Sequence, residues 1–182
     1  ARREARRMLV GKRGARASCR QEDINALMVK LAGQGKHVVR LKSGDPMVFG
    51  RAGEEIAGLH RAGIPTEVVP GVTAALAMAS RLGVSLTHRD IAHSVTFVTG
   101  HARDGRLPDL DWTALARWGA TLVVYMGGRT AAALAARLME EGLAPDLPAT
   151  AVWALGRADE RSALATLATL PDGIAEIGFD QP

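Results

Sequence analysis

The stretch VVRLKSGDPMVFGRAGEE, residues 38–55, decides the fold of this chain. It begins inside a short strand pattern, HVVRLK (37–42), crosses a loop rich in Gly and Pro, and enters a helix pattern, GEEIAGLHRAG (53–63). Acidic residues in the first helical turn and Gly63 at the end suit the helix dipole and the helix C-cap. A strand followed by a loop and a helix is typical of a parallel sheet that helices cover.

The loop inside this stretch has the residues of a ligand-binding turn. Gly44 lets the backbone turn where a side chain would clash, and Pro46 fixes the exit from the turn. Asp45 follows the carboxyl end of the strand, which is the edge where open α/β sheets bind ligands. Glycines flank Arg51 before the helix begins. An ordinary strand–helix loop also uses Gly, Asp and Pro, so the local pattern is equally consistent with a loop that binds no ligand.

The alternation of strands and helices continues on both sides of this stretch. Residues 21–35 place apolar side chains at helical spacing and end in glycines, which predicts a helix. The alternation pauses at residues 84–93, so we expect two α/β domains, residues 1–88 and 89–182. The other predicted elements are strands at 66–70, 94–100, 120–128, 149–156 and 161–170, and helices at 72–83, 111–119 and 129–142.

Length and composition exclude several classes of protein. The chain has 182 residues, of which 47% are hydrophobic and 23% charged, as in ordinary globular domains. The single cysteine, Cys19, excludes an intramolecular disulfide and a cysteine-cluster metal site within one chain. There is neither an apolar run of the ~20 residues that span a bilayer nor a signal-peptide pattern. We therefore expect a soluble, cytoplasmic protein that does not bind membranes.

Positive charge gathers at the start of the chain. Residues 1–16 carry seven Lys or Arg and one Glu, a net charge of +6, whereas the remaining residues have sixteen basic and eighteen acidic groups, a net of −2. The body of the chain is therefore not a nucleic-acid-binding surface. The basic arm is interpreted as a solvated helix face or as a binding site for phosphate or carboxylate groups.

Two further segments carry residues that chemistry could use. In VVPGVTAALAMAS (68–80), a Pro-Gly turn precedes Thr73 and a helix of small residues, which would let a ligand or another backbone approach closely. A Pro-Gly turn with a Thr N-cap explains the same pattern without a ligand. LTHRD (86–90) and SVTFVTGH (94–101) contain histidines that are candidates for proton transfer, although structural histidines are the more common case.

Motifs of other enzyme classes are absent from the sequence. There is no HExxH or GxSxG, so metal hydrolase and serine hydrolase readings have no support. The P-loop pattern GxxxxGK[ST] and the dinucleotide fingerprint GxGxxG are also absent.

Seven segments together resemble uroporphyrinogen-III C-methyltransferases of the tetrapyrrole methylase family, which use S-adenosylmethionine. They keep their order and run from about residue 9 to about residue 170. LTHRD and VTFVTGH after a GDPxVFGR loop are the most specific feature. The segments are GKR (11–13), QEDIN (21–25), VVRLKSGDPMVFGRAGEE (38–55), VVPGVTAA (68–75), LTHRDIAHSVTFVTGH (86–101), LDW (110–112) and LVVYMG (122–127).

The resemblance implies the tetrapyrrole methylase fold, in which two α/β domains hold the active site in the cleft between them. It implies methylation of uroporphyrinogen III at two ring carbons, which gives precorrin-2 for sirohaem and cobalamin biosynthesis. The methyl donor is S-adenosylmethionine and no metal is needed, because the sulfonium already activates the methyl group. Family members are homodimers, so the resemblance implies a homodimer here.

The resemblance also implies roles for individual residues. Lys12, in GKR, matches a lysine assigned to proton transfer, which carbon methylation of the macrocycle requires. Arg40 and Arg51 look like cleft arginines that bind the eight carboxylates of the substrate, because Arg forks suit carboxylates. The residues that match the cofactor-binding segments are Ser43, Gly44, Asp45, Val48, Thr73, Ala74, Met126 and Gly156.

The chain departs from the family pattern at both ends. The family opens with a strand and a GxGxGD loop, then a second strand bearing an Asp proposed as the base, and it closes with a hydrophobic strand. We expect this chain to lack these parts, to leave backbone unpaired in its first sheet, and to have little activity alone. The alternatives are an inactive remnant that binds the cofactor or a partner, and a related corrin-ring methylase. A free-standing enzyme and part of a bifunctional sirohaem synthase both fit the sequence.

Overall fold

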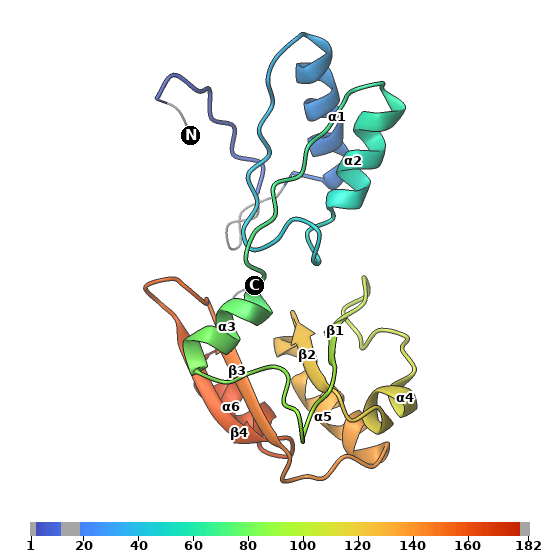
Figure 1. Ribbon diagram of the computed structural model, residues 1–182, viewed down its shortest axis with the longest axis vertical. Helices are drawn as coiled ribbons and strands as arrows, with labels where there is room; N and C mark the ends of the chain where they lie inside the picture. The colour runs from blue at the N-terminus through green and yellow to red at the C-terminus, as the bar shows by residue number, and fades with distance from the viewer. Residues whose placement is uncertain (1–2, 12–18, 179–182) are drawn as a thin grey trace. The chain divides into compact units, whose positions relative to one another are not determined.

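The computed structural model describes residues 3–11 and 19–178, which form two compact units (Figure 1). The first unit spans residues 3–71 and the second residues 72–178. The sequence prediction put the boundary between 88 and 89, whereas helix α3 (Ala74–Leu82) belongs with the second unit. Hydrogen bonds to Tyr125 hold the start of α3 there.

The first unit is built on two helices that pack against each other, α1 (Gln21–Gly33) and α2 (Ala52–Arg61) (Figure 1). Ile24 and Met28, four residues apart on one face of α1, are buried, as helical spacing predicts. Both helices lie where the sequence predicts them.

The strands that the sequence predicts at 37–42 and 66–70 are not part of any sheet among the described residues. Their apolar side chains are largely exposed: Val39 is 66% exposed, Leu41 70% and Val69 74%. An alternating pattern favours extended backbone, but a strand also needs a neighbouring strand to complete its hydrogen bonds. The prediction that these segments pair as strands is therefore wrong for the described chain.

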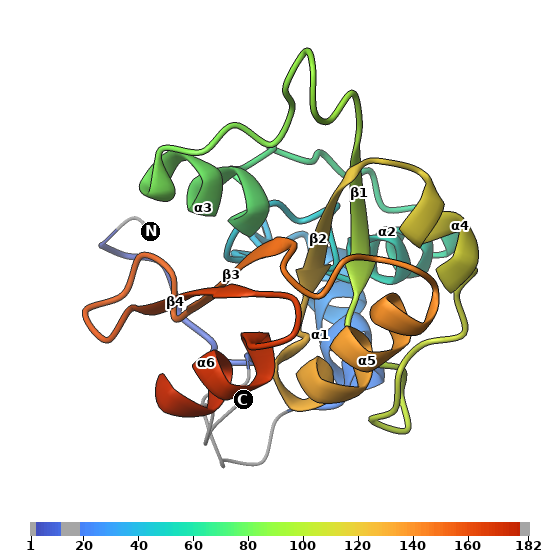
Figure 2. The same cartoon turned by 90° about the horizontal axis from the view of Figure 1, so that it is seen from below.

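The second unit contains two separate pairs of strands. Strands β1 (Val95–Thr99) and β2 (Thr121–Tyr125) pair in parallel, with Val95 opposite Thr121 and Thr99 opposite Tyr125. Strands β3 (Pro148–Trp153) and β4 (Arg161–Thr166) form an antiparallel hairpin, so the expectation of a parallel sheet holds only for β1 and β2. Helix α6 (Leu170–Glu176) lies against this hairpin, where Gly173 meets Ala163 (Figure 2).

The core of the second unit lies around helix α5 (Ala131–Glu140), which follows a short 3₁₀ turn, η1 (Gly128–Thr130). Leu134 and Leu138 are buried on one face of α5, as their spacing predicts. They pack with a residue of helix α4 (Trp112–Arg117) and with the end of the β3–β4 hairpin, and the buried cluster consists of Trp112, Leu134, Ala135, Leu138 and Leu167.

Candidate functional site

The loop at 43–51 in the first unit is fixed by Asp45. One carboxylate oxygen of Asp45, Oδ1, accepts a hydrogen bond from the backbone N–H of Met47 at 2.8 Å. The other, Oδ2, accepts one from the N–H of Gly71 at 3.0 Å. The hydrogen bonds from Gly71 and Met47 lower the pKa of Asp45, so the carboxylate is ionised at neutral pH. Asp45 therefore joins this loop to the Pro-Gly turn at 70–71.

Glycine is required where the loop and the turn approach each other. A Cβ at Gly71 would overlap the carbonyl oxygen of Gly44. Gly44 itself has φ +66°, a backbone conformation that costs residues with a Cβ about 1–2 kcal/mol. Gly50 is restricted in the same way, because a Cβ there would overlap the carbonyl of Pro46. The glycines that the sequence marked as turn residues thus pack backbone against backbone.

The loop ends in a strained turn before α2. Phe49 and Arg51 have φ values of +50° and +56°, which residues other than glycine rarely adopt. The guanidinium of Arg51 donates to both carboxylate oxygens of Glu54, at 2.7 and 2.6 Å. The Arg51 side chain is half exposed, so its charge is accessible to an anion. Val48, in the same loop, is half-buried.

The other predicted substrate arginine, Arg40, lies in a different setting. Its Nε donates to Glu55 at 3.2 Å, and its side chain is 27% exposed. Lys42 donates to the second oxygen of Glu55 at 2.9 Å, next to Ser43. The sequence analysis did not select Glu55. The feature that could have indicated it is the presence of a second acidic residue in the first turn of α2.

In the second unit, the predicted residue Met126 follows the carboxyl end of β2, beside two glycines that the sequence analysis did not select. Gly100 follows β1 and its N–H donates to the carbonyl of Tyr125 at 2.6 Å. Gly100 and Gly127 approach so closely that a Cβ on Gly100 would overlap the backbone of Gly127. Met126 directly follows β2 and precedes Gly127. It has φ +59°, and 52% of its surface is exposed. This is the edge at which parallel sheets bind ligands.

Tyr125 connects this edge to the start of α3. Its hydroxyl lies 2.6 Å from the Oγ1 of Thr73 and accepts a hydrogen bond from the N–H of Ala75 at 3.0 Å. Thr73 is the N-cap residue of α3, but its hydroxyl bonds to Tyr125 instead of capping the helix. The structure therefore brings Thr73 and Ala74 close to Met126 through a tyrosine that the sequence analysis did not select.

Gly156 lies in the turn after β3 and has φ +76°. Its N–H donates to Glu160 at 2.6 Å, and Glu160 in turn pairs with Arg81 of α3 at 3.0 Å. The hydrogen bond from Gly156, followed by that from Arg81, lowers the pKa of Glu160. The described contacts thus connect Gly156 to α3, at the opposite end of the helix from Thr73.

The remaining candidates are a lysine and two histidines. Lys12 lies outside the described residues. Both histidines contact backbone: the Nδ1 of His88 accepts from the N–H of Asp90 at 3.2 Å, and that of His101 lies 3.1 Å from the carbonyl of Met126. In the described part of the chain, no three His, Cys, Asp or Glu residues gather to hold a metal. No helix there is long and apolar enough to cross a membrane.

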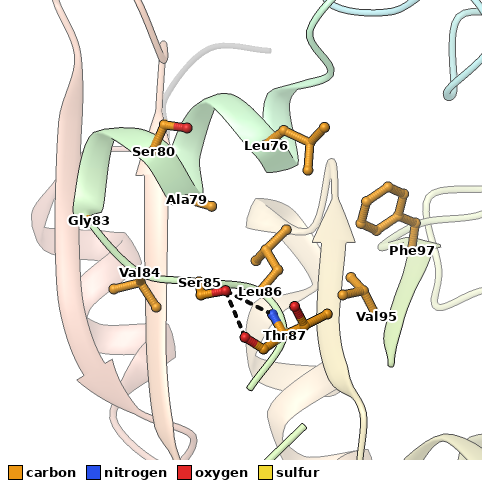
Figure 3. A pocket seen from close by; sticks show the side chains of 10 residues that line it. All are labelled: Leu76, Ala79, Ser80, Gly83, Val84, Ser85, Leu86, Thr87, Val95 and Phe97. Carbon is orange, nitrogen blue, oxygen red and sulfur yellow. Dashed lines mark hydrogen bonds between the residues drawn. The ribbon is translucent and has the colours of Figure 1, made fainter. Parts of the chain in front are cut away.

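A pocket of about 490 Å³ in the second unit is separate from these residues (Figure 3). It lies between α3 and β1 and is lined mainly by apolar side chains, among them Leu76, Leu86 and Phe97. Its polar side includes Ser85, whose hydroxyl donates to the carbonyl of Thr87 at 2.7 Å. None of the predicted site residues lines it.

Comparison with known proteins identifies the family. The model of the tetrapyrrole (corrin/porphyrin) methylases matches residues 2–171. This chain belongs to the tetrapyrrole methylase family. Two curated relatives match its whole length: the siroheme synthases of Methylococcus capsulatus, 48% identical, and of Chromobacterium violaceum, 53% identical. The chain spans 38% of the length of each of these relatives.

Solved structures confirm the tetrapyrrole methylase fold. The uroporphyrin-III C-methyltransferase of Thermus thermophilus, complexed with S-adenyl homocysteine, matches with a TM-score of 0.73 and 42% identity over 85% of this chain and 67% of that one. A cobalt precorrin-4 methyltransferase matches with a TM-score of 0.80 and 27% identity, over 89% of this chain and 68% of that one. The α/β fold class expected from the sequence is therefore confirmed.

Proposed function

We propose that this tetrapyrrole methylase chain transfers methyl groups from S-adenosylmethionine to two ring carbons of uroporphyrinogen III, in the route to sirohaem and cobalamin. The observation that carries the proposal is the 42% identity to a uroporphyrin-III C-methyltransferase whose structure contains S-adenyl homocysteine. The siroheme synthases, about 50% identical over this chain, support the same activity.

In each unit, the predicted cofactor residues have features that suit S-adenosylmethionine binding. Gly44 in the first unit has φ +66°, and Gly71 packs on its carbonyl oxygen; in the second unit, Gly100 packs on the backbone of Gly127. Met126 offers an accessible apolar side chain beside them. Both oxygens of Asp45 are engaged by backbone N–H groups, so Asp45 contributes by shaping the loop. When bound, the cofactor supplies an activated methyl group on its sulfonium.

The protein's own task is then to orient the two reactants and move a proton. We assign Ser43, Gly44, Asp45 and Val48 of the first unit, and Thr73, Ala74, Met126 and Gly156 of the second, to cofactor binding. When the protein holds a ring carbon in line with the methyl group, the entropy of bringing the two reactants together is lost on binding. The barrier of the chemical step is therefore lower. Lys12 is proposed as the proton-transfer group, which suits an amine whose pKa its surroundings can lower.

The substrate is proposed to bind through arginine. Arg51 is the better placed of the two candidates because its side chain is half exposed and its partner, Glu54, is equally exposed. Arg40 is engaged with the buried Glu55, so contact with substrate would require it to leave that carboxylate. We further propose that the protein is a cytoplasmic homodimer.

The activity test uses the complete gene product that contains this chain, under anaerobic conditions. With uroporphyrinogen III and S-adenosylmethionine, S-adenosylhomocysteine should form, and omission of the tetrapyrrole should stop its formation. A Gly44→Val variant serves as the comparison, because it strains the cofactor loop and should lose most of the rate. A folded wild-type protein that forms no S-adenosylhomocysteine would contradict the proposal and favour the inactive remnant.

A second methylase reading is tested in the same assay. The cobalt precorrin-4 methyltransferase superposes with the higher TM-score, 0.80, but its identity of 27% is well below 42%. Fold is shared across a family, whereas side chains decide the substrate, so identity is the better guide. Turnover of a later corrin intermediate, without turnover of uroporphyrinogen III, would reverse this assignment.

A further inference from the structure

Glu55 is the most deeply buried acidic side chain among the described residues of the first unit, and the roles proposed above do not include it. It lies in the first turn of α2 with 6% of its side chain exposed. One oxygen, Oε1, accepts from the Nε2 of Gln21 at 3.0 Å and from the Nε of Arg40 at 3.2 Å. The other, Oε2, accepts from the Nζ of Lys42 at 2.9 Å.

Three segments that are far apart in the sequence meet at this carboxylate. Gln21 begins α1, Arg40 and Lys42 come from the extended segment before the loop, and Glu55 begins α2. Burial alone would raise the pKa of Glu55, but the hydrogen bonds from Lys42 and Gln21 and the nearby positive charges outweigh it and lower the pKa. A buried carboxylate is tolerated only when its partners satisfy it in this way.

The position of this cluster relative to the loop suggests what it does. Lys42 directly precedes Ser43, and the next helical turn after the loop carries both Glu54 and Glu55. The entry to the loop is thus tied to α2 by Lys42–Glu55, and its exit is tied to α2 by Arg51–Glu54. Asp45 ties the middle of the loop to Gly71. No sheet supports this loop in the described residues; these side-chain bonds hold it together with a backbone hydrogen bond from the N–H of Val48 to the carbonyl of Asp45 at 3.3 Å.

We propose that Glu55 is a positioning residue for the cofactor loop, acting through Lys42 to set the conformation of Ser43, Gly44 and Asp45. This inference rests on the proposed function, because it takes that loop to bind S-adenosylmethionine. Removing the carboxylate leaves two cations that are largely buried, with side chains 12% and 27% exposed, in need of new partners. Lys42 would then turn toward water and carry the start of the loop with it.

The first experiment measures binding of S-adenosylhomocysteine by titration calorimetry to the complete gene product. Glu55→Gln keeps the shape of the side chain and removes its charge, and it should weaken binding about tenfold, as a misplaced loop would. Glu22→Gln is the matched control on α1, where the side chain is 69% exposed and pairs with the exposed Arg20 at 3.4 Å; the affinity of this variant should stay within twofold of wild type. Circular dichroism and thermal unfolding confirm that each variant is folded at the titration temperature.

A double-mutant cycle separates positioning from general destabilisation. Lys42→Met should weaken S-adenosylhomocysteine binding to a similar degree, and the double variant Lys42→Met/Glu55→Gln should bind no worse than either single variant. Hydrogen exchange provides the second readout: exchange in residues 43–51 should speed up in Glu55→Gln and stay unchanged in Glu22→Gln.

The outcomes distinguish this inference from the proposed function. If the wild-type protein binds S-adenosylhomocysteine and folded Glu55→Gln binds it equally well, the positioning role is wrong and the proposed function stands. Fully additive losses in the cycle would also overturn the role through Lys42. If the wild-type protein does not bind S-adenosylhomocysteine, the proposed function fails, and the inference fails with it.

Discussion

The loop at 43–51 in the first unit and the edge formed by Gly100 and Met126 in the second are built by different means. Charged side chains hold the first: Asp45, Glu54 and Glu55 bond its middle and both of its ends. Strand register and close backbone contact hold the second, where the parallel pairing of β1 and β2 brings Gly100 against Gly127. Changes of charge should therefore affect the first site and leave the second intact, whereas changes of volume should affect ligand binding at the first site and stability at the second.

The largest effect is expected from a volume change in the second unit. Gly100→Val places a Cβ on the backbone of Gly127, so the backbone at position 100 must move. That movement would disrupt the hydrogen bond from the Thr130 hydroxyl to the carbonyl of residue 100, which is 2.5 Å long. The free energy of unfolding should fall by about 3 kcal/mol or more, as overpacking against backbone does. Urea unfolding measures this. Gly58→Ala, in α2 with no atom near its Cβ, is the control and should change stability by less than about 1 kcal/mol.

The corresponding change in the first unit should act on binding. Gly71→Ala forces the Pro-Gly turn away from the Gly44 carbonyl and stretches the bond to Asp45. Affinity for S-adenosylhomocysteine, measured by calorimetry, should drop more than tenfold. Equal affinity in a folded Gly71→Ala protein would show that this turn does not shape the cofactor loop.

Substitutions of Arg51 and of Arg40 should differ in which ligand's binding they weaken. Arg51→Met should raise the KM for uroporphyrinogen III about tenfold and change S-adenosylhomocysteine affinity by less than about twofold, because the Arg51–Glu54 pair is half exposed and an exposed ion pair contributes little to holding the loop. Arg40→Met should affect both ligands, since it removes a partner of Glu55. Steady-state kinetics with each substrate varied in turn gives the answer. A KM effect on the cofactor from Arg51→Met would reverse the assignment.

Acid should loosen the first site before it affects the Gly100–Gly127 contact. The folded protein lowers the pKa of Asp45 and Glu55 below their ordinary values of 3.8 and 4.5, so folding stabilises their ionised forms. Their contribution is complete at pH values above these ordinary values and is lost as the pH falls through the folded pKa values. Hydrogen exchange, corrected for intrinsic rates, should therefore rise in residues 43–51 below pH about 4.5, with residues 95–100 following only at lower pH. Simultaneous loss in both segments would contradict the contrast.

The smallest effect is expected at Tyr125. Tyr125→Phe removes the hydroxyl that contacts Thr73 and Ala75, and it should cost about 1–2 kcal/mol of unfolding free energy because buried polar groups are left without that partner. Thermal unfolding detects a change of this size. Thr73→Ser keeps a hydroxyl at the contact and should retain most of the stability.

Local patterns predicted five of the six α-helices in the described residues, all except α6, and predicted the contacts between segments poorly. The spacing of Ile24 and Met28, and of Leu134 and Leu138, marks the buried faces of α1 and α5 because each helix turn repeats within a few residues. The strands expected at 37–42 and 66–70 failed because pairing depends on a neighbour that a local pattern does not contain. Glu55 and Tyr125 were missed for the same reason: their partners lie 13 to 52 residues away in the sequence.

The central claim is that this chain methylates uroporphyrinogen III, and the mass of the product tests it most directly. The complete gene product is incubated anaerobically with uroporphyrinogen III and S-adenosylmethionine carrying a deuterated methyl group, and the tetrapyrrole is analysed by mass spectrometry. The account predicts that two labelled methyl groups appear on the macrocycle. A tetrapyrrole recovered at its starting mass, from a protein that is folded and binds S-adenosylhomocysteine, would contradict it.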